Sequence, residues 1–361
     1  MRIIATHLLN DFSGSPKVLK QLLNGWIKNG LTVDLHTCRD KEGFLSDITG
    51  VNYYSFNYKW AASPFIRLVN LVFSQLSLCL HILKTSKKDD IIYINTVLPF
   101  GAALAGKIKG NRIIYHIHET SIKPALLKSF LFGMVKWCAT DVVYVSNYLA
   151  KQEPVSNAFT HILHNAIEDD FLAKANNSIT EESTRLKNIL MVCSLKEYKG
   201  VYEFITLASR LPHHSFKLVL NASQYDIDEF FRNTHLPSNL KLYETQSNVH
   251  PFYKWADLVV NLSQPAAWIE TFGLTIIEGM AYGNPAIVPP IGGVTEVITE
   301  GVNGYQLSSK NLDDIVNKIA AWSEDKMNFQ TFQKEAKKSI TQFNEHAFVS
   351  KSIQLLTTNK I

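Results

Sequence analysis

The sequence has few cysteines and no long apolar segment free of charge. Its four cysteines, Cys38, Cys79, Cys138 and Cys193, are spaced neither as a disulfide framework nor as a metal site. We therefore expect reduced thiols and a cytoplasmic protein. No window of about 18 residues is both apolar and uncharged, so we predict no transmembrane helix. The apolar start at residues 3–5 is too short for a signal-peptide core and is typical of a first strand.

Charged residues are also sparse, at 19% of a chain that is 46% hydrophobic. This composition is that of a globular protein and excludes a disordered one. No repeat at a solenoid period is visible, which excludes the common repeat architectures. With 361 residues the chain is long enough for two domains with ordinary cores.

The few charges are unevenly distributed along the chain. The net charge is +4, yet the segment from Lys59 to Lys151 holds 12 Lys and Arg against 4 Asp and Glu, a balance of +8. This excess suits an anionic partner such as a membrane surface, a lipid phosphate or a nucleotide. A basic, solvated surface with no partner is the alternative.

Short apolar runs alternate with helical patterns throughout the chain. Alternation of this kind predicts α/β architecture with parallel sheets covered on both faces. The predicted strands are residues 3–5, 32–35, 91–94, 113–115 and 142–145 in the first half, and 189–192, 216–220, 258–260 and 286–288 in the second. Between the first two strands, apolar residues recur at helical spacing over 18–27.

A polar stretch at residues 164–183 interrupts the apolar pattern and predicts a domain boundary. We expect two Rossmann-like, doubly wound domains that face each other across a cleft, with ligand at the carboxyl ends of the strands. The predicted N-terminal domain comprises residues 1–165 and a C-terminal helix at about 345–361. The predicted C-terminal domain comprises residues 166–344.

Two loops that leave strands have residues suited to phosphate. Gly14 lies in the turn after the first strand, where backbone N–H groups at a helix start attract anions. Lys199 follows the strand 189–192 and can offer a point charge to a phosphate, with Lys196 as a possible helper. The alternatives are a plain helix cap at Gly14 and solvated lysines.

The stretch 270–285 combines two carboxylates with a predicted helix start near Gly273. Glu270 lies on the loop before that helix and Glu278 lies within it. Carboxylates accept hydrogen bonds from hydroxyl groups, while the N–H groups at a helix start bind anionic oxygen. This combination fits a polyol carrying a diphosphate, that is, a nucleotide sugar; two surface acids on a helix are the alternative. The predicted N–H donors are Phe272, Gly273, Leu274 and Thr275.

Two patterns suggest metal sites only weakly. His116 and His118 alternate along a strand and point to one face, but no third ligand lies nearby in the sequence. Asp226 and Asp228 have the spacing of metal-dependent glycosyltransferases, but their position before an apolar pair favours a helix cap. We therefore expect no metal.

The block 270–304 resembles the retaining GT-B glycosyltransferases, and glycosyltransferase family 4 in particular. The resemblance rests on Glu270 and Glu278 with the intervening Phe-Gly-Leu, on the Gly-Asn-Pro at 283–285 and on the Gly-Gly at 292–293. It extends to Lys199-Gly200, to residues 164–167 and to Gly14, and so includes both halves of the chain.

The resemblance implies metal-independent transfer of a sugar from a nucleoside diphosphate with retention of configuration, and no cofactor. Glu270 would contact the donor sugar and Glu278 the ribose. Lys199, the amides of 272–275 and the Gly14 amide would hold the diphosphate. His118 would lie near the donor sugar and the acceptor hydroxyl. Ser194 stands where the family often has an arginine, which leaves Lys196 as a substitute in the phosphate clamp.

The implied function is transfer to a glycan or a polyprenyl-linked glycan in surface polysaccharide synthesis, with no nucleic-acid partner. The N-terminal domain would bind the acceptor and the C-terminal domain the donor. Residues 64–83 and 122–137 are apolar and hold basic residues, so each is interpreted either as a membrane-surface helix at the inner face of the membrane or as an ordinary buried helix. Two other functions stay open: a nucleotide-sugar epimerase on the same fold, and an inactive binding subunit of a glycan-assembly complex.

Overall fold

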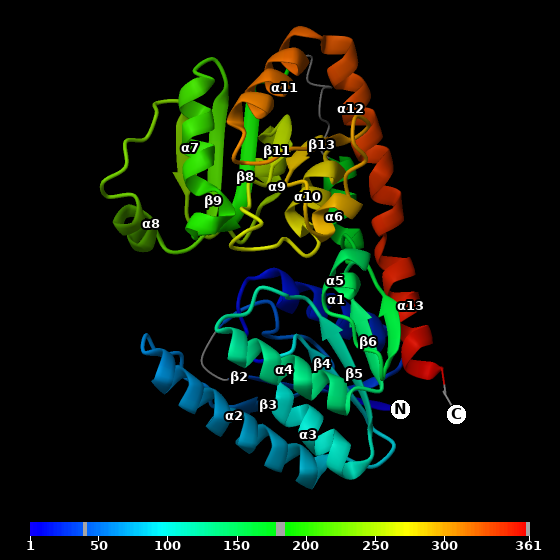
Figure 1. The fold of residues 1–361 in the computed structure, drawn as a ribbon. Coiled ribbons are helices and arrows are strands. Elements are labelled where there is room, and N and C mark those ends of the chain that lie inside the picture. The colour runs from blue at the N-terminus through cyan, green and yellow to red at the C-terminus, as the bar shows by residue number, and fades with distance from the viewer. Residues whose placement is uncertain (39–41, 178–184, 359–361) are drawn as a thin grey trace. The chain divides into compact units, whose positions relative to one another are not determined.

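The computed structural model describes residues 1–38, 42–177 and 185–358. The chain divides into two compact units (Figure 1). The N-terminal unit comprises Met1–His164 and His346–Ile361, and the C-terminal unit comprises Asn165–Glu345. The sequence-based division lies within one residue of these bounds.

The N-terminal unit is built on a parallel sheet, which has seven strands among the described residues in the order β3-β2-β1-β4-β5-β6-β7. The branched apolar runs form its centre, where every residue of β4 is buried. The strands are β1 (Arg2–Thr6), β2 (Thr32–Cys38), β3 (Val51–Phe56), β4 (Ile91–Asn95), β5 (Arg112–Ile117), β6 (Asp141–Tyr144) and β7 (Phe159–Ile162).

The helices of this unit cover both faces of its sheet. They are α1 (Gly14–Lys28), α2 (Pro64–Thr85), α3 (Phe100–Lys109), α4 (Ala125–Cys138), α5 (Asn147–Gln152) and α13 (Glu345–Thr357). Right-handed crossovers place α1 on one face and α2, α3 and α4 on the other. The latter three lie side by side (Figure 1). The returning helix α13 packs on α1, where Trp26 Nε1 donates to Ser352 Oγ over 3.0 Å.

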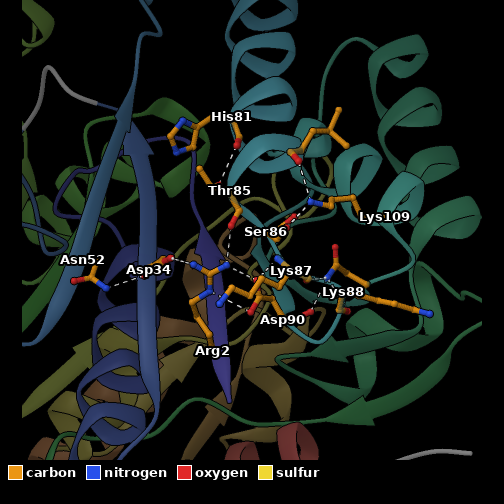
Figure 2. Close-up of polar contacts among 12 residues, drawn as sticks. Arg2, Asp34, Asn52, His81, Thr85, Ser86, Lys87, Lys88, Asp90 and Lys109 are labelled. Atoms are coloured by element: carbon orange, nitrogen blue, oxygen red, sulfur yellow. Dashed lines mark hydrogen bonds and ion pairs between the residues drawn. The ribbon is translucent and has the colours of Figure 1, made fainter.

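The C-terminal end of α2 is fixed to the sheet by two basic side chains (Figure 2). Arg2 donates to the carbonyl of Thr85 over 2.8 Å and forms ion pairs with Asp34 and Asp90. Lys109 Nζ on α3 donates to the carbonyl of Leu83 over 2.9 Å. Because the last carbonyls of a helix have no partner within it, these cations satisfy groups that would otherwise be orphaned.

Helix α2 bears on the prediction that the chain has no transmembrane helix. By length and composition alone it is apolar enough to cross a bilayer, and a third of its most apolar window is buried. Its charged residues, Arg67 and Lys84, lie near its two ends. Every window of about 18 residues within the helix includes at least one of them, so the criterion of an uncharged window missed this helix.

The C-terminal unit has a second parallel sheet, with six strands among the described residues in the order β10-β9-β8-β11-β12-β13. Its core includes Phe204 and Phe216 from one helix and one strand, together with Trp322 and Phe329 from two further helices. The strands are β8 (Asn188–Ser194), β9 (Ser215–Asn221), β10 (Leu240–Tyr243), β11 (Leu258–Val260), β12 (Ala286–Val288) and β13 (Gly304–Gln306).

Helices flank this sheet as well. The α-helices are α6 (Asp169–Asn177), α7 (Val201–Arg210), α8 (Gln224–Phe230), α9 (His250–Trp255), α10 (Leu274–Ala281), α11 (Leu312–Glu324) and α12 (Lys326–Ser339). The described part of the unit also has three short 3₁₀ turns, η1 (Glu197–Lys199), η2 (Gly293–Glu296) and η3 (Ile340–Phe343). Two Rossmann-like units confirm the predicted fold class.

Each sheet has one place where the strand order reverses direction. In the N-terminal unit this point lies between β1 and β4, and in the C-terminal unit between β8 and β11. Ligands of open parallel sheets bind beyond the carboxyl ends of the strands at such points. The loops after these four strands are therefore where a site is expected.

Candidate active site

In the C-terminal unit, the loops after β8 and β11 bring together three polar side chains. Lys199 ends the turn η1 that follows β8, and Asn261 directly follows β11. Both side chains reach Glu270: Lys199 Nζ lies 2.8 Å from Glu270 Oε2, and Asn261 Nδ2 donates to the same oxygen over 3.3 Å. The predicted phosphate ligand and the predicted sugar ligand are thus direct neighbours.

The Lys199–Glu270 pair is largely buried, with side-chain exposures of 14% and 19%. Burial alone would lower the pKa of Lys199, but the adjacent carboxylate outweighs it and raises that pKa. Burial likewise opposes ionisation of Glu270, yet Lys199 and Asn261 lower its pKa below the ordinary value. Both groups are therefore charged at neutral pH. The nearby Cys193 thiol is the opposite case, since burial raises its pKa to about 12.

Two aromatic side chains border this pair, and sequence reasoning did not find them. Tyr198 and Trp268 stack with ring centroids 5.2 Å apart and planes 14° from parallel. Lys199 Nζ lies 5.3 Å from the centroid of the Trp268 ring, within the range of a cation–π contact. The backbone connects the two loops, because the Gln264 amide donates to the Tyr198 carbonyl over 2.8 Å. The aromatic pair thereby fixes the direction from which Lys199 approaches Glu270.

Two glycines allow the backbone around Glu270 to close up. Gly273 adopts φ +104° and precedes the first residue of α10, so the helix begins where the sequence predicted. Gly292 adopts φ +122°, and a Cβ there would lie 2.4 Å from the Glu270 carbonyl oxygen. The amide of Gly293 donates to that carbonyl over 2.8 Å. The Gly-Gly motif therefore holds the loop that carries Glu270.

The predicted N–H donors lie at the start of α10. Leu274 and Thr275 are its first two residues, whose N–H groups an α-helix leaves without an intrahelical acceptor. The Phe272 side chain is buried, and its ring lies against Phe343. Its predicted contribution is therefore limited to its backbone.

The predicted helpers of Lys199 lie less favourably. Ser194 is the last residue of β8, and its carbonyl accepts from the Lys196 amide over 2.9 Å. Lys196 itself is exposed at the start of η1, whereas Lys199 is the lysine that points inward to Glu270. The substitution of Lys196 for the family's arginine stays a prediction.

Glu278 lies deeper than expected. It is 6% exposed, and Tyr253 Oη on α9 donates to its Oε2 over 2.7 Å. Burial raises the pKa of Tyr253 well above its usual range, which keeps the hydroxyl a donor. Glu278 is therefore not a surface acid, the alternative that the sequence left open, because Tyr253 orients its carboxylate inside the unit. Its role toward ribose stays a prediction.

In the N-terminal unit, Asn95 links the predicted His118 to the start of α1. Asn95 Nδ2 donates to the Ser15 carbonyl over 3.0 Å, and this fixes the orientation of the amide. Its Oδ1 therefore faces His118 Nε2 at 2.9 Å, so the proton of His118 is assigned to Nε2. Gly14 is the first residue of α1, directly before Ser15. The structure thus brings Gly14 and His118 to one edge of the sheet, at its switch point.

His118 belongs to a buried group of titratable side chains. Its ring lies 4.2 Å from that of His116, which approaches Tyr93 Oη at 2.9 Å. Burial lowers the pKa of His116 to about 3 and that of His7 to about 4, and it lowers that of His118 well below the usual range, with help from both neighbours. Burial raises the pKa of Glu119 to about 7. At neutral pH the three imidazoles are neutral.

The patterns that suggested metal sites do not form ligand clusters within the described ranges. There, no group of three or more His, Cys, Asp or Glu side chains is arranged to hold a metal ion. Asp226 and Asp228 lie in α8, and Ser223 caps that helix by accepting from the Asp226 amide over 3.2 Å. The expected helix is therefore present, but the expectation that the Asp pair caps it is wrong, because the helix begins earlier and Ser223 is its cap.

Comparisons with known proteins agree with these arrangements. Residues 174–339, which lie within the C-terminal unit, match the family of glycosyl transferases group 1. N-acetyl-alpha-D-glucosaminyl L-malate synthase of Bacillus anthracis is 24% identical over 72% of this chain and 72% of its own. Lipopolysaccharide 1,2-N-acetylglucosaminetransferase of Salmonella typhimurium is 22% identical over 80% of this chain and 79% of its own.

Solved structures match over both units. HepE of Anabaena, in complex with UDP and glucose, superposes with a TM-score of 0.79 at 17% identity, covering 99% of this chain and 100% of that chain. Sucrose-phosphate synthase of Thermosynechococcus elongatus gives a TM-score of 0.78 at 16% identity, with 98% of each chain covered. These likenesses show the GT-B fold, and the family match in the C-terminal unit supports a glycosyltransferase.

Proposed function

We propose that this glycosyltransferase moves a sugar from a nucleoside-diphosphate sugar to a glycan or polyprenyl-linked glycan, with retention of configuration and without a metal. The Lys199–Glu270 pair at the start of α10 is the observation that carries the proposal. It places a cation and a carboxylate, both largely buried and both charged, beside helix N–H groups at a switch point. A donor needs all three kinds of group.

Donor binding would exchange partners within this pair. A diphosphate is a stronger partner for Lys199 than one carboxylate, and the α10 N–H groups add donors without adding charge. Glu270, released from Lys199, can accept hydrogen bonds from sugar hydroxyls. Asn261 already donates to Glu270 and keeps the carboxylate in place during the exchange.

The same groups would assist departure of the nucleotide. Negative charge grows on the phosphate oxygens as the glycosidic bond breaks, and the fixed positive charge of Lys199 stabilises that charge. Glu278 would accept the ribose hydroxyls, with Tyr253 holding its carboxylate in one orientation. Ribose would therefore bind where the second turn of α10 faces α9.

The N-terminal unit would serve the acceptor. Neutral His118, with its proton on Nε2 toward Asn95, would present its ring as a hydrogen-bonding group near the reacting hydroxyl. The basic segment of this unit would make peripheral contact with the inner face of a membrane in surface polysaccharide synthesis. The similarity to lipopolysaccharide 1,2-N-acetylglucosaminetransferase supports the role in surface polysaccharide synthesis.

A thermal-shift panel of nucleoside diphosphates and their sugars tests the donor. A ligand at about 100 times its dissociation constant adds roughly 2.7 kcal/mol of stability. UDP is the first compound to try, because HepE was solved with UDP and glucose. Donor turnover is then measured with a chelator and a glycan acceptor, and it distinguishes a glycosyltransferase from an epimerase and from an inactive subunit. Conversion of the donor to an isomer without acceptor would identify an epimerase, and binding without any turnover would identify an inactive subunit.

A further inference from the structure

Helix α2 exposes an unusual number of large apolar side chains. Phe65 is 73% exposed, Phe73 69% and Leu80 59%. Phe65 lies in the first turn of the helix, Phe73 near its middle and Leu80 in its last third. Four further apolar residues of the same helix are also exposed: Ile66, Leu68, Val72 and Leu76. Contiguous apolar surface of this kind marks an interaction site in a folded protein.

These side chains share one face of the helix. At about 100° per residue, the seven exposed positions fall within an arc of about 160°. The buried positions Leu71, Leu78 and Ile82 point in a different direction, toward the rest of the unit. Helix α2 is therefore apolar on two sides, and only one of them is used by the fold.

The helix is held along the unit rather than projecting from it. Gln75 in its middle accepts from the Gly101 amide of α3 over 3.0 Å. Its C-terminal carbonyls are bound by Arg2 and Lys109 (Figure 2). Pulling α2 away to span a bilayer would break these contacts. The exposed face therefore runs along the length of the helix, on the side that the unit does not cover.

Basic side chains outnumber acidic ones around this face, where Asp89, next to Lys88, is the exposed acid nearest the end of α2. The helices α2, α3 and α4 together hold six Lys and Arg and no Asp or Glu. Lys84 lies in the last turn of α2, and Lys87 and Lys88 lie just beyond the end of that helix at Thr85; all three are exposed. At the other end, Arg67 lies 5.1 Å from the centroid of the exposed Trp60 ring. Basic side chains and a tryptophan at the border of an apolar helix face are typical of helices that lie in a membrane interface.

We propose that the exposed face of α2, with Trp60, lies in the interface of an anionic lipid bilayer. The seven apolar side chains enter the boundary between headgroups and acyl chains, and Lys84, Lys87 and Lys88 contact lipid phosphates. Charge complementarity selects a lipid surface over a second copy of this chain, because two such faces would bring the basic residues at the ends of α2 in one copy, Arg67, Lys84, Lys87 and Lys88, against those of the other. This surface would make the membrane contact proposed above. Only the purpose of that contact, access to a lipid-linked acceptor, rests on the proposed function.

Sedimentation with vesicles tests this inference on the full chain. Vesicles of equal parts phosphatidylcholine and phosphatidylglycerol should sediment the wild-type protein, and vesicles of phosphatidylcholine alone should do so much less. The double variant Phe65→Asp with Phe73→Asp should lower partition into the anionic vesicles about tenfold or more. The matched control is Met327→Asp on α12, which alters a residue that is 77% exposed in the other unit and should partition like wild type.

Two results with vesicles would overturn the inference, and a third result, without them, would do so as well. One is wild-type protein that stays in the supernatant with anionic vesicles. The other is a double variant that sediments as wild type does. Self-association of the wild type that the double variant abolishes, without vesicle binding, would assign the face to a second copy instead and equally overturn it. The thermal shift produced by UDP is recorded on each variant without lipid, so a failed donor site and a failed membrane surface give separate readings.

Discussion

Replacing Glu270 by glutamine removes one charge from the buried pair and keeps the shape of the side chain. Loss of one partner of a fully buried ion pair typically costs about 3–5 kcal/mol, because the other charge is left uncompensated. Here the side chains are 14% and 19% exposed, and the amide oxygen of glutamine can still accept from Lys199. We therefore expect a loss of roughly 2 kcal/mol, which in a unit of this size lowers the Tm by about 4–8 °C.

The same variant should separate binding from turnover. Lys199 no longer has to leave a carboxylate before it meets a phosphate, and a negative charge beside the diphosphate is gone. The affinity for UDP should therefore rise, by roughly threefold or more. Sugar transfer should fall by about 100-fold or more, because Glu270 no longer offers a carboxylate to the donor sugar in the transition state.

Calorimetry with UDP, donor turnover and thermal melting of Glu270→Gln measure these three quantities. The control is Asp313→Asn, which breaks an exposed pair with Arg210 whose side chains are 77% and 39% exposed. It should shift the Tm by no more than about 2 °C. Turnover of Glu270→Gln near the wild-type rate, or UDP affinity that falls along with turnover, would refute the partner exchange.

Three further changes probe separate parts of the account. Lys199→Met should weaken binding of UDP at least about tenfold while leaving uridine binding unaltered, since only the former has a diphosphate; an equal loss for both would argue against a phosphate contact. Glu278→Ala should weaken nucleotide binding by roughly 1–3 kcal/mol in calorimetry if a charge-assisted hydrogen bond to ribose is lost; unchanged affinity would remove Glu278 from the ribose site. Acid should destabilise the N-terminal unit. The folded-state pKa values of His7 (about 4), His36 (about 3) and His116 (about 3) lie below the ordinary value of 6.5, and the pKa of His118 is lowered too. Unfolding therefore takes up protons as the pH falls below about 6.5. Glu119, with its pKa raised to about 7, opposes this by one proton. Urea melts should therefore give lower stability at pH 5 than at pH 7, and equal values would contradict the buried neutral histidines.

The sequence predicted the centre of each sheet and missed its borders. The nine predicted strands are all present. The four unpredicted strands, β3, β7, β10 and β13, are the edge strands of the two sheets. Three of the six residues of β3 are exposed, as are the first two of β7, so neither has the continuous apolar run that a strand buried on both faces requires. Edge strands are specified by the neighbour on which they form, which a local pattern does not contain.

The candidate site was predictable in its parts and not in its contacts. Lys199 and Glu270 were each singled out, but 71 residues separate them and no local pattern shows that they pair. Asn261 and Trp268 were missed because no recognised motif includes them. A signal for Asn261 was present, since it directly follows the predicted strand 258–260. Positions at the carboxyl ends of central strands therefore merit the same attention as motifs.

Helix α2 shows a different limit of sequence reasoning. Its apolar pattern was interpreted as either a buried helix or a membrane-surface helix, because composition alone does not tell which side a fold covers. The structure settles the burial, with one apolar side packed and the other exposed. An apolar helical pattern therefore predicts a core helix only where neighbouring elements cover every apolar side of the helix, which the sequence does not show.

The most direct test of the central claim is the anomeric form of the sugar released from a nucleotide donor. Donor hydrolysis in the presence of a chelator, followed by proton NMR from the first minutes, needs no knowledge of the acceptor. For an α-linked UDP-sugar the account predicts that the α anomer appears first, that the wild type releases it without added metal, and that Glu270→Gln does not. First appearance of the β anomer, or release that requires a divalent ion, would contradict retaining, metal-independent transfer at the Lys199–Glu270 site.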